Sequence, residues 1–585
     1  MREIFAKWRT SGPHEPISDF PGDNFRRGGP GEVAGKELTM TTEVGSQTGL
    51  KKEMSRLDLT MAGLGAIIGS GWLFGVLYAA NDAGPAAIVA WLIGGVAVAL
   101  IGLVYAELSG MIPEAGGIAR YPHFTHGSLT GFMMGWAAFI AYATVPAIEA
   151  EAVIQYAEHY IPSFANSSLT RFVAEAILLV IFFLINYYGV KAFAKTNTVV
   201  TSIKFIMPTL TVLVFLFVAP HWSNLHYHAA SPSIPGGFAP FGLTGILKAV
   251  ALSGVVFAFL GFRQAVDLAG EARNPQRDAP RAIMTAIGIA IVLYALLQVV
   301  FIIGVPTSDL TKGWAALSFS GPFAQVASAL GLGWLATLLY ADAVLSPAGT
   351  GNVYLASTAR VVYALANNHY LHPVFRKLNP RSAVPLLGLV ATLVVGILAL
   401  LPFPTWQSLV GVISAATVFT YMIGPISASV LRRTHDDAHR PFRLGGISVI
   451  SPLAFVMGTL IIYWTGWNID WKLVVAILAG SIIYAIVASR PGTSLDRVDG
   501  AAFKSAAWLL LYLVFLLAMT YFGSSAFGAP YNHGKGLIEY PLDLVVVVVA
   551  ALIFYWAGVA SGRSTDAGDA AVAQAAVNRL ATEGE

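Results

Sequence analysis

The sequence contains no cysteine, and only 11% of its 585 residues carry charged side chains. The absence of cysteine excludes disulfide bonds, thiolate metal sites and thiol nucleophiles. Soluble domains have about 25% charged residues, whereas hydrophobic residues make up 56% of this chain and its mean hydropathy is +0.67. The composition therefore predicts an integral membrane protein that lies in a lipid bilayer.

Motifs of enzymatic chemistry and of nucleotide binding are also missing. The chain has no HExxH, GxSxG or P-loop pattern, which argues against an enzyme and against an ATP-driven pump. No basic run with interleaved aromatic residues occurs outside the loops that flank apolar segments, so nucleic acid is not an expected partner. The histidines of residues 221–230 are too loosely spaced to predict a metal site. We expect no cofactor and no metal.

Long apolar segments dominate the chain instead. A helix needs about 20 apolar residues to cross a bilayer. That window predicts fourteen spans, and therefore an all-α polytopic membrane protein. The predicted spans are residues 57–80, 85–109, 129–157, 171–189, 197–219, 244–269, 281–304, 325–356, 384–401, 406–430, 447–466, 472–489, 505–523 and 541–560.

Lysine and arginine are distributed unevenly between the loops. With a cytoplasmic N-terminus, the inside segments hold 28 of these residues and the outside segments hold 4. Cytoplasmic loops carry the excess of basic residues in membrane proteins. The asymmetry predicts a multi-pass protein of the cell (inner) membrane with both termini in the cytoplasm. Residues 1–56 are predicted to be a disordered cytoplasmic tail, and residues 561–585 a cytoplasmic C-terminal tail with one short helix.

The segment GLGAIIGSGWLFG, residues 63–75, places five glycines and a serine inside the first predicted span. In hydrocarbon an unpaired backbone group is costly, so a membrane helix is broken only where the freed groups meet protein, ions or ligand. A half-helix that begins near Ser70 and Gly71 would present its N–H groups to a carboxylate. The carbonyls of Ala66 and Ile67 would receive an ammonium. An α-amino acid carries both groups; alternatively, the glycines only let another helix pack closely.

A second interruption is predicted in the sixth span, SGVVFAFLGFRQAVDLAGE, where Gly261 falls near the middle. It follows the first break by five spans, which is the spacing that an inverted repeat of five plus five helices would produce. Paired broken helices indicate a transporter.

Four motifs, in this order along the chain, resemble the amino acid/polyamine/organocation (APC) superfamily. GLGAIIGSGWLFG resembles its first-helix signature, and YAELSGMIPEAGGIARYP (105–122) resembles the end of its second helix. FAFLGFRQAVDLAGEARNPQRDAPRAI (257–283) resembles its sixth helix and the following loop, and STARVVYALANNHYLHPVFRKLNP (357–380) the end of its eighth. The loop elements that match are Glu271, Asn274, Pro275, Pro280 and Arg281.

The resemblance implies an amino acid permease with a ten-helix transporter core, residues 57–430, built from two inverted five-helix repeats with broken helices 1 and 6. Accessory helices 11–14 would occupy residues 431–560, as in the fourteen-span branches of the superfamily. Phe259 and Phe262 would be gates or walls of the pocket. The substrate-binding positions that the resemblance implies are Ala66, Ile67, Gly69, Ser70, Gly71, Phe257, Ala258, Phe259, Leu260 and Gly261.

Lys204 lies inside the fifth predicted span, and an ionisable group there calls for a functional hypothesis. In the superfamily, a lysine at the matching place can occupy the volume where sodium-coupled relatives bind their ion. Its ammonium could bond the carbonyls freed by the first break and lose that tie on deprotonation, which would couple transport to protons. A structural brace and a side chain that snorkels to the interface are the alternatives. Hydroxyls of Ser346, Thr350 and Ser357 keep sodium coupling open.

Arg263 departs from the family pattern, because many relatives carry an acidic residue immediately after the Gly-Phe of helix six. A guanidinium below the unwound segment could hold a second substrate carboxylate with two hydrogen bonds. Arg263 is therefore an added substrate-binding candidate, and it slightly favours aspartate or glutamate as the substrate. The alternative is an ion pair within the helix with Asp267, four residues further on.

Three further acidic residues lie within predicted spans and complete the proton-coupling candidates with Lys204. Glu149 and Glu151 are two residues apart and should point to different faces of the third span. Asp342 lies in the eighth span near a proline and two glycines. Each of these three residues could relay protons. The alternative is that it forms a buried structural hydrogen bond or faces the lumen.

The sequence thus predicts a secondary transporter that imports an amino acid with protons by alternating access. Acidic, neutral, and cationic or polyamine substrates all stay open, with the acidic class slightly ahead. The mechanistic alternative is an exchanger of amino acids. A membrane sensor that binds an amino acid without net transport is the alternative from another class. The oligomeric state and the role of the last two spans are not predicted.

Overall fold

The computed structural model describes residues 54–114, 116–188, 190–229, 231–379, 384–402, 405–490, 492–498 and 500–583. The N-terminal tail predicted for residues 1–56 falls almost entirely outside these residues. The residues described are α-helical apart from short 3-10 helices and connecting segments, and none of them belongs to a β-strand. The prediction of an all-α protein is confirmed.

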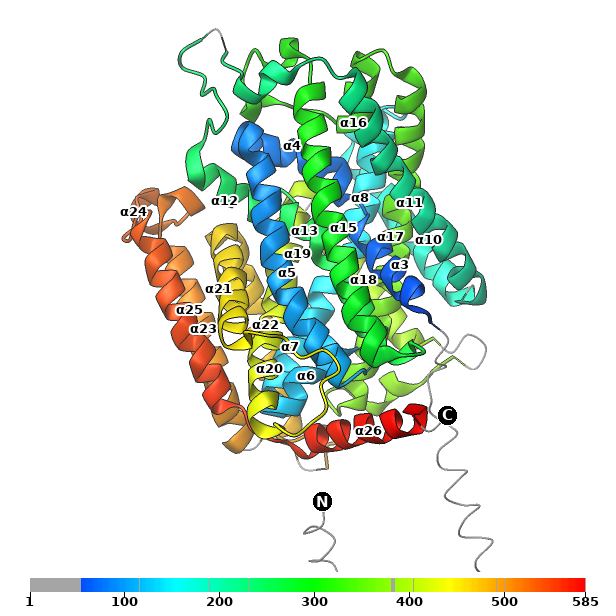
Figure 1. Ribbon diagram of the computed structural model, residues 1–585, viewed down its shortest axis with the longest axis vertical. Helices are drawn as coiled ribbons and strands as arrows, with labels where there is room; N and C mark the ends of the chain where they lie inside the picture. Colours follow the sequence, from blue (N-terminus) through cyan, green and yellow to red (C-terminus); the bar gives the residue numbers. More distant parts are fainter. Residues whose placement is uncertain are drawn as a thin grey trace, which may run out of the picture. The chain divides into compact units, whose positions relative to one another are not determined.

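Each of the fourteen predicted apolar stretches lies on one helix or on a series of helices (Figure 1). By length and composition, ten helices of the described chain can cross a membrane, or eleven if the bent series from Gly242 to Asp267 is one span. The helices of these stretches are α3 (Arg56–Ile67), α4 (Gly71–Ala83), α5 (Ala87–Met111), α7 (Ser128–Ala143), α8 (Val145–Ala157), α10 (Ser168–Tyr188), α11 (Val190–Val218), α12 (Gly242–Leu252), α13 (Val255–Phe259), α14 (Arg263–Asp267), α15 (Pro275–Gly304), α16 (Pro322–Ala329), α17 (Gly333–Asn367), α18 (Leu386–Leu400), α19 (Trp406–Tyr421), α20 (Ile423–Thr434), α21 (Ile447–Thr465), α22 (Trp467–Ala488), α23 (Gly500–Phe522) and α25 (Leu542–Ser561).

The first span is interrupted where its glycines cluster. Helix α3 ends at Ile67 and α4 begins at Gly71, so Ile68, Gly69 and Ser70 lie between two half-helices. The N–H of Gly69 donates to the carbonyl of Ile67 at 3.0 Å instead of following the helical pattern back to Gly65. The break therefore frees the Gly65 carbonyl for a side chain.

The sixth span is interrupted earlier than the sequence predicts. It bends by 45° between α12 and α13, at Ser253 and Gly254. Gly254 has φ +88°, a left-handed conformation that favours glycine, and a Cβ there would lie 2.5 Å from the ring of Trp406. At Gly261, the predicted position, the chain instead tightens into the 3-10 turn η3 (Leu260–Phe262).

Gly261 has a different role, because it brings the two interrupted spans into direct contact. A Cβ on this residue would overlap the backbone of Ala66 and Ile67 at the end of α3. Small residues permit such close approach between helices in membranes. The 3-10 turn η3 of the sixth span therefore lies against the end of α3, next to the break of the first span.

Two short helices lie at the end of the bundle opposite α4. Helix α6 (Gly117–His126) follows α5, and α26 (Asp566–Glu583) crosses beneath the long helices in Figure 1. The hydroxyl of Thr565 donates to the Phe124 carbonyl at 2.9 Å, and His435 lies 2.9 Å from the Asp569 carboxylate. The short helix expected within the C-terminal tail is present as α26, which has 18 residues and packs against α6.

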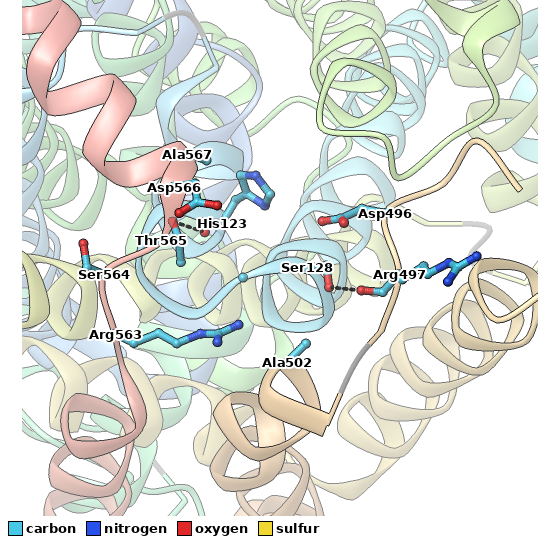
Figure 2. Close-up of a pocket in the computed structure, with 11 residues that line it drawn as sticks. His123, Ser128, Asp496, Arg497, Ala502, Arg563, Ser564, Thr565, Asp566 and Ala567 are labelled. Atoms are coloured by element: carbon cyan, nitrogen blue, oxygen red, sulfur yellow. Dashed lines mark hydrogen bonds between the residues drawn. The ribbon is translucent and has the colours of Figure 1, made fainter. Parts of the chain in front are cut away.

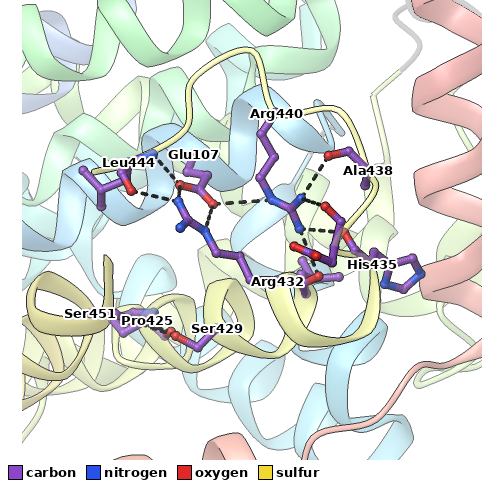
Figure 3. A network of polar contacts seen from close by, with 11 residues as sticks. Glu107, Pro425, Ser429, Arg432, His435, Ala438, Arg440, Leu444 and Ser451 are labelled. Carbon is purple, nitrogen blue, oxygen red and sulfur yellow. Dashed lines mark hydrogen bonds and ion pairs between the residues drawn. The ribbon is translucent and has the colours of Figure 1, made fainter. Parts of the chain in front are cut away.

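A buried carboxylate near the same end ties α5 to α20 (Figure 3). Glu107 accepts two hydrogen bonds from Arg432, at 2.7 and 2.6 Å, and one from the N–H of Leu444 at 2.7 Å. Arg440 Nε lies 3.6 Å from the same carboxylate. One carboxylate thus lies against two guanidinium groups, which also donate to nearby backbone carbonyls.

We expect Glu107→Gln to destabilise the protein by about 3 kcal/mol or more, because removing one partner of a buried ion pair leaves the other charge unpaired. Thermal unfolding of the purified protein measures the effect as a lower midpoint. Arg443→Gln is the control, since Arg443 is exposed at the edge of the same cluster. Equal midpoints for Glu107→Gln and the control would show that the cluster does not stabilise the fold.

Gly261→Ala should prevent the close contact between the 3-10 turn of the sixth span and the end of α3, and should greatly reduce the yield of folded protein. The matched control is Gly288→Ala on α15, where a Cβ meets nothing within 4 Å and alanine favours the helix by about 1 kcal/mol. Size-exclusion profiles and unfolding temperatures of the two variants make the comparison. A normal profile for Gly261→Ala would contradict the close packing.

Candidate functional site

Side chains from three other helices satisfy the carbonyls freed by the first break. Lys204 Nζ, from α11, donates to the Gly65 carbonyl and to Thr350 Oγ1, both at 2.6 Å. The Tyr294 hydroxyl, from α15, donates to the Ile67 carbonyl at 2.8 Å. On α17, Thr350 and Ser346 contact the Ile68 carbonyl at 3.3 and 3.4 Å. The sequence predicted that Lys204 would bond these carbonyls. It did not predict Tyr294, which only the structure identifies as a partner.

The other side of the break presents a hydrogen-bond donor, and a carboxylate occupies it. The Ser70 N–H, at the start of α4, donates to Glu149 Oε2 at 2.8 Å. The Ser70 hydroxyl accepts a hydrogen bond from Trp406 Nε1 at 2.8 Å. A negative charge at this position is stabilised by the positive end of the helix dipole. Glu149 therefore caps the half-helix at the place where the sequence predicts a substrate carboxylate.

Aromatic rings cover the break on the α4 side. Trp406 packs against Phe74 and Tyr78 with centroid distances of 5.3 and 5.5 Å, and Phe257 meets it edge-on at 5.9 Å. Sequence reasoning missed Trp406, because a tryptophan at the start of a predicted span reads as an interfacial anchor.

The two phenylalanines that the resemblance singled out face other neighbours. Phe259 packs on Trp91 and Tyr294 at 5.8 and 5.3 Å. Phe262 packs on Tyr105 and Tyr421. The Tyr421 hydroxyl also donates to the Leu260 carbonyl at 2.7 Å. Phe257, by contrast, contacts the ring of Trp406, whose Nε1 donates to the Ser70 hydroxyl.

Arg263, the first residue of α14, follows the 3-10 turn η3 of the sixth span, and only part of its guanidinium is engaged. Its Nε donates to Asp267 at 2.8 Å, so the predicted pair within the helix is present. The Nη1 and Nη2 groups have no hydrogen-bond partner, and the whole side chain is 0% exposed. The guanidinium carbon lies 2.9 Å from the ring centroid of Tyr142 and 5.7 Å from that of Tyr354. Two buried donors therefore remain for another acceptor.

The acidic candidates of the third span are separated, as their spacing predicts. Glu149 faces the break, whereas Glu151 forms an ion pair with Arg171. Arg171 also contacts Glu158 at 2.5 Å and Glu175 at 3.2 Å. Glu151 thus belongs to a separate ion cluster between α8 and α10.

Asp342 is a buried carboxylate without a hydrogen bond. Both of its oxygens lack a partner, and the residue is 3% exposed. Asp342 and Glu149 are the acidic groups that interact electrostatically with Lys204. The third hydroxyl of the sodium alternative, that of Ser357, instead accepts a hydrogen bond from Gln264 at 3.0 Å.

The groups at the break are closed to solvent. Ser70 is 0% exposed, and Glu149 and Lys204 are each 1% exposed. A ligand therefore reaches this site only after helices move, as alternating access requires.

A different cavity, of about 430 Å³, lies near α6 and α26 and includes no residue of the interrupted spans (Figure 2). His123 lines it and bonds the Tyr370 hydroxyl at 2.5 Å. Burial lowers the pKa of His123 to about 4, so its ring is neutral at physiological pH. The lining residues are His123, Gly127, Ser128, Asp496, Arg497, Ala502, Arg563, Ser564, Thr565, Asp566 and Ala567.

Comparison with known proteins identifies the family. The sequence model of the family described as "Amino acid permease" matches residues 54–490. The aspartate-proton symporter of Bacillus subtilis (strain 168) is 40% identical over 519 residues, which cover 87% of this chain and 97% of that protein. The glutamate/serine transporter AimA of the same organism is 40% identical over 527 residues, which cover 88% and 95%.

A more distant relative is named for branched-chain amino acids. The branched-chain amino acid permease BcaP of Bacillus subtilis (strain 168) is 26% identical over 469 residues, which cover 77% of this chain and 95% of that protein. These proteins are named as permeases or transporters, in agreement with the absence of enzyme motifs. The family match spans the region of the four motifs, and the chain therefore belongs to the amino acid permease family of the APC superfamily.

Proposed function

We propose that this protein imports an acidic amino acid, aspartate or glutamate, by proton symport with alternating access. The names of the two relatives at 40% identity support both the substrate class and the coupling ion. The observation that carries the acidic substrate is Arg263, which follows the 3-10 turn of the sixth span and whose two buried Nη groups have no partner. A carboxylate fits such a pair of donors with two parallel hydrogen bonds.

The substrate's backbone groups are assigned to the first break. Its α-carboxylate binds at the N–H groups of Ser70 and Gly71, next to Gly69. Its ammonium binds carbonyls near Ala66 and Ile67 and those of residues 257–260. Tyr294 and Tyr421 already donate to two of these carbonyls. A carbonyl oxygen has two lone pairs, so these contacts leave room for an ammonium.

Proton coupling is assigned to Lys204, Glu149 and Asp342. Lys204 Nζ joins the break of the first span to Thr350 of α17, and loss of its proton would remove the positive charge from both contacts. That change also alters the proton affinity of the neighbouring carboxylates, because all three groups interact in a buried region of low dielectric. Glu151 is not included, since its partner is Arg171.

The membrane topology belongs to the same proposal. Fourteen spans, with both termini cytoplasmic, follow from the fourteen apolar stretches and from the distribution of lysine and arginine. Residues 57–430 form a transporter core of two inverted five-helix repeats, with interrupted spans 1 and 6, in the cell membrane. Residues 431–560 are accessory helices.

Uptake of labelled amino acids into proteoliposomes tests the function. We expect an inward proton gradient to drive accumulation of aspartate or glutamate without sodium, and Lys204→Ala to abolish it. The control is Lys312→Ala, which changes an exposed lysine. A requirement for sodium would contradict proton coupling, and a requirement for substrate preloaded inside would show exchange. Absence of transport in every condition would favour a sensor.

Removing the guanidinium should discriminate between substrates. We expect Arg263→Gln, combined with Asp267→Asn so that no carboxylate loses its partner, to raise the KM for aspartate. Loss of a hydrogen bond to a charged group costs about 1.5–3 kcal/mol, or roughly 10- to 150-fold in KM. Competition by serine should change little. Arg277→Gln, on an exposed position, is the control; equal losses for aspartate and serine would exclude Arg263 as the reader of the second carboxylate.

A further inference from the structure

Glu149 occupies the donor that the proposed function assigns to the substrate. Its Oε2 accepts the Ser70 N–H at 2.8 Å. Its Oε1 lies so close to Gly69 that a Cβ on that residue would be 2.6 Å away. The carboxylate thus lies against the backbone of the break, in the space that the glycine leaves open.

A substrate α-carboxylate would need the same place. The start of a helix offers a small number of unpaired N–H groups and a positive dipole end, and it binds carboxylates of any origin. Two ionised carboxylates in contact repel each other strongly. Glu149 in its charged form and the substrate's carboxylate therefore exclude each other at Ser70.

The charges around Glu149 offer one compensating cation. Lys204, from α11, interacts electrostatically with Glu149, and Asp342, from α17, competes for the same ammonium. The phenols of Tyr294 on α15 and Tyr354 on α17 are the other titratable groups facing Glu149. On α10, Arg171 and Glu175 face Glu151 instead. The substrate's own ammonium balances the charge of its α-carboxylate, so the two carboxylates compete for the Ser70 N–H itself.

We propose that Glu149 is a built-in competitor of the substrate, and that one proton is taken up on Glu149 for each substrate carboxylate bound at Ser70. This inference rests on the proposed function and assigns its coupled proton to a residue. The proton adds to a Glu149 oxygen and forms an O–H bond. The Ser70 N–H then donates its hydrogen bond to the substrate carboxylate instead of to Glu149. When the proton leaves on the other side of the membrane, Glu149 regains its charge and displaces the substrate.

The competition is separate from the contacts of Lys204. Lys204 donates to Gly65 and Thr350, whereas Glu149 accepts from Ser70. Loss of Lys204 would weaken the break on its carbonyl side but leave the two carboxylates in competition for one N–H. The two residues therefore make different predictions for binding at equilibrium.

Binding of aspartate to the purified full-length protein tests the proposal, with the dissociation constant measured at several pH values. Proton uptake on binding is measured with an indicator dye in weak buffer. The wild type should take up about one proton per aspartate, and its Kd should rise about tenfold per pH unit where Glu149 is ionised. Glu149→Gln should bind aspartate with a Kd that does not vary with pH, and its proton uptake should fall close to zero.

Glu151→Gln is the matched control, because it makes the same change two residues away on the same helix, where the partner is Arg171. It should keep the pH slope and the proton uptake of the wild type. If Glu149→Gln also keeps them, another group takes the proton and the inference is wrong, while the proposed function stands. If the wild type binds aspartate without proton uptake, the coupling itself is overturned.

A second variant covers the case in which Glu149→Gln does not fold. Glu149→Asp keeps the charge but shortens the side chain by one methylene, so its carboxylate no longer reaches the Ser70 N–H. We expect this variant to bind aspartate more tightly than the wild type at high pH. Unchanged or weaker binding would overturn the competition.

Discussion

The need to satisfy backbone groups at the break of the first span organises the centre of this protein. A membrane interior offers no water to the groups freed at residues 68–70. Lys204, Tyr294, Thr350 and Glu149 supply the missing partners, and they come from four different helices. Hydrogen bonds therefore join five spans at one place. They are needed because an unpaired amide or carbonyl in a membrane costs free energy.

The same place also concentrates charge. An ammonium and two carboxylates lie together, and the Arg263 guanidinium follows the 3-10 turn that packs against the end of α3. All of these groups are closed to solvent. In low dielectric, adding or removing one proton changes every interaction in such a group. A site of this kind is suited to linking proton transfer with the binding of a charged substrate, because each event changes the free energy of the other.

The two interrupted spans differ in how they are held. Gly261 places backbone against backbone, and only glycine permits that approach. The side-chain bonds at the break can instead be exchanged for bonds to a ligand or to water. The contact at Gly261 is thus suited to keep the two spans together, while the polar bonds are suited to break and re-form during transport. At the α26 end of the bundle, the Glu107 cluster joins α5 to α20 independently of this site.

The sequence by itself determined the all-α class, the apolar stretches, the interrupted first span and Lys204 as a partner of the freed carbonyls. Composition, glycine clustering and a charge in an apolar segment are local properties. It also separated Glu149 from Glu151 by helical spacing. The bend at Gly254, the partners Tyr294 and Trp406, and the two unpaired Nη groups of Arg263 were decided only by tertiary structure. The reason is that a hydrogen bond between residues as distant as Ser70 and Trp406 depends on how whole helices pack, which no local pattern records.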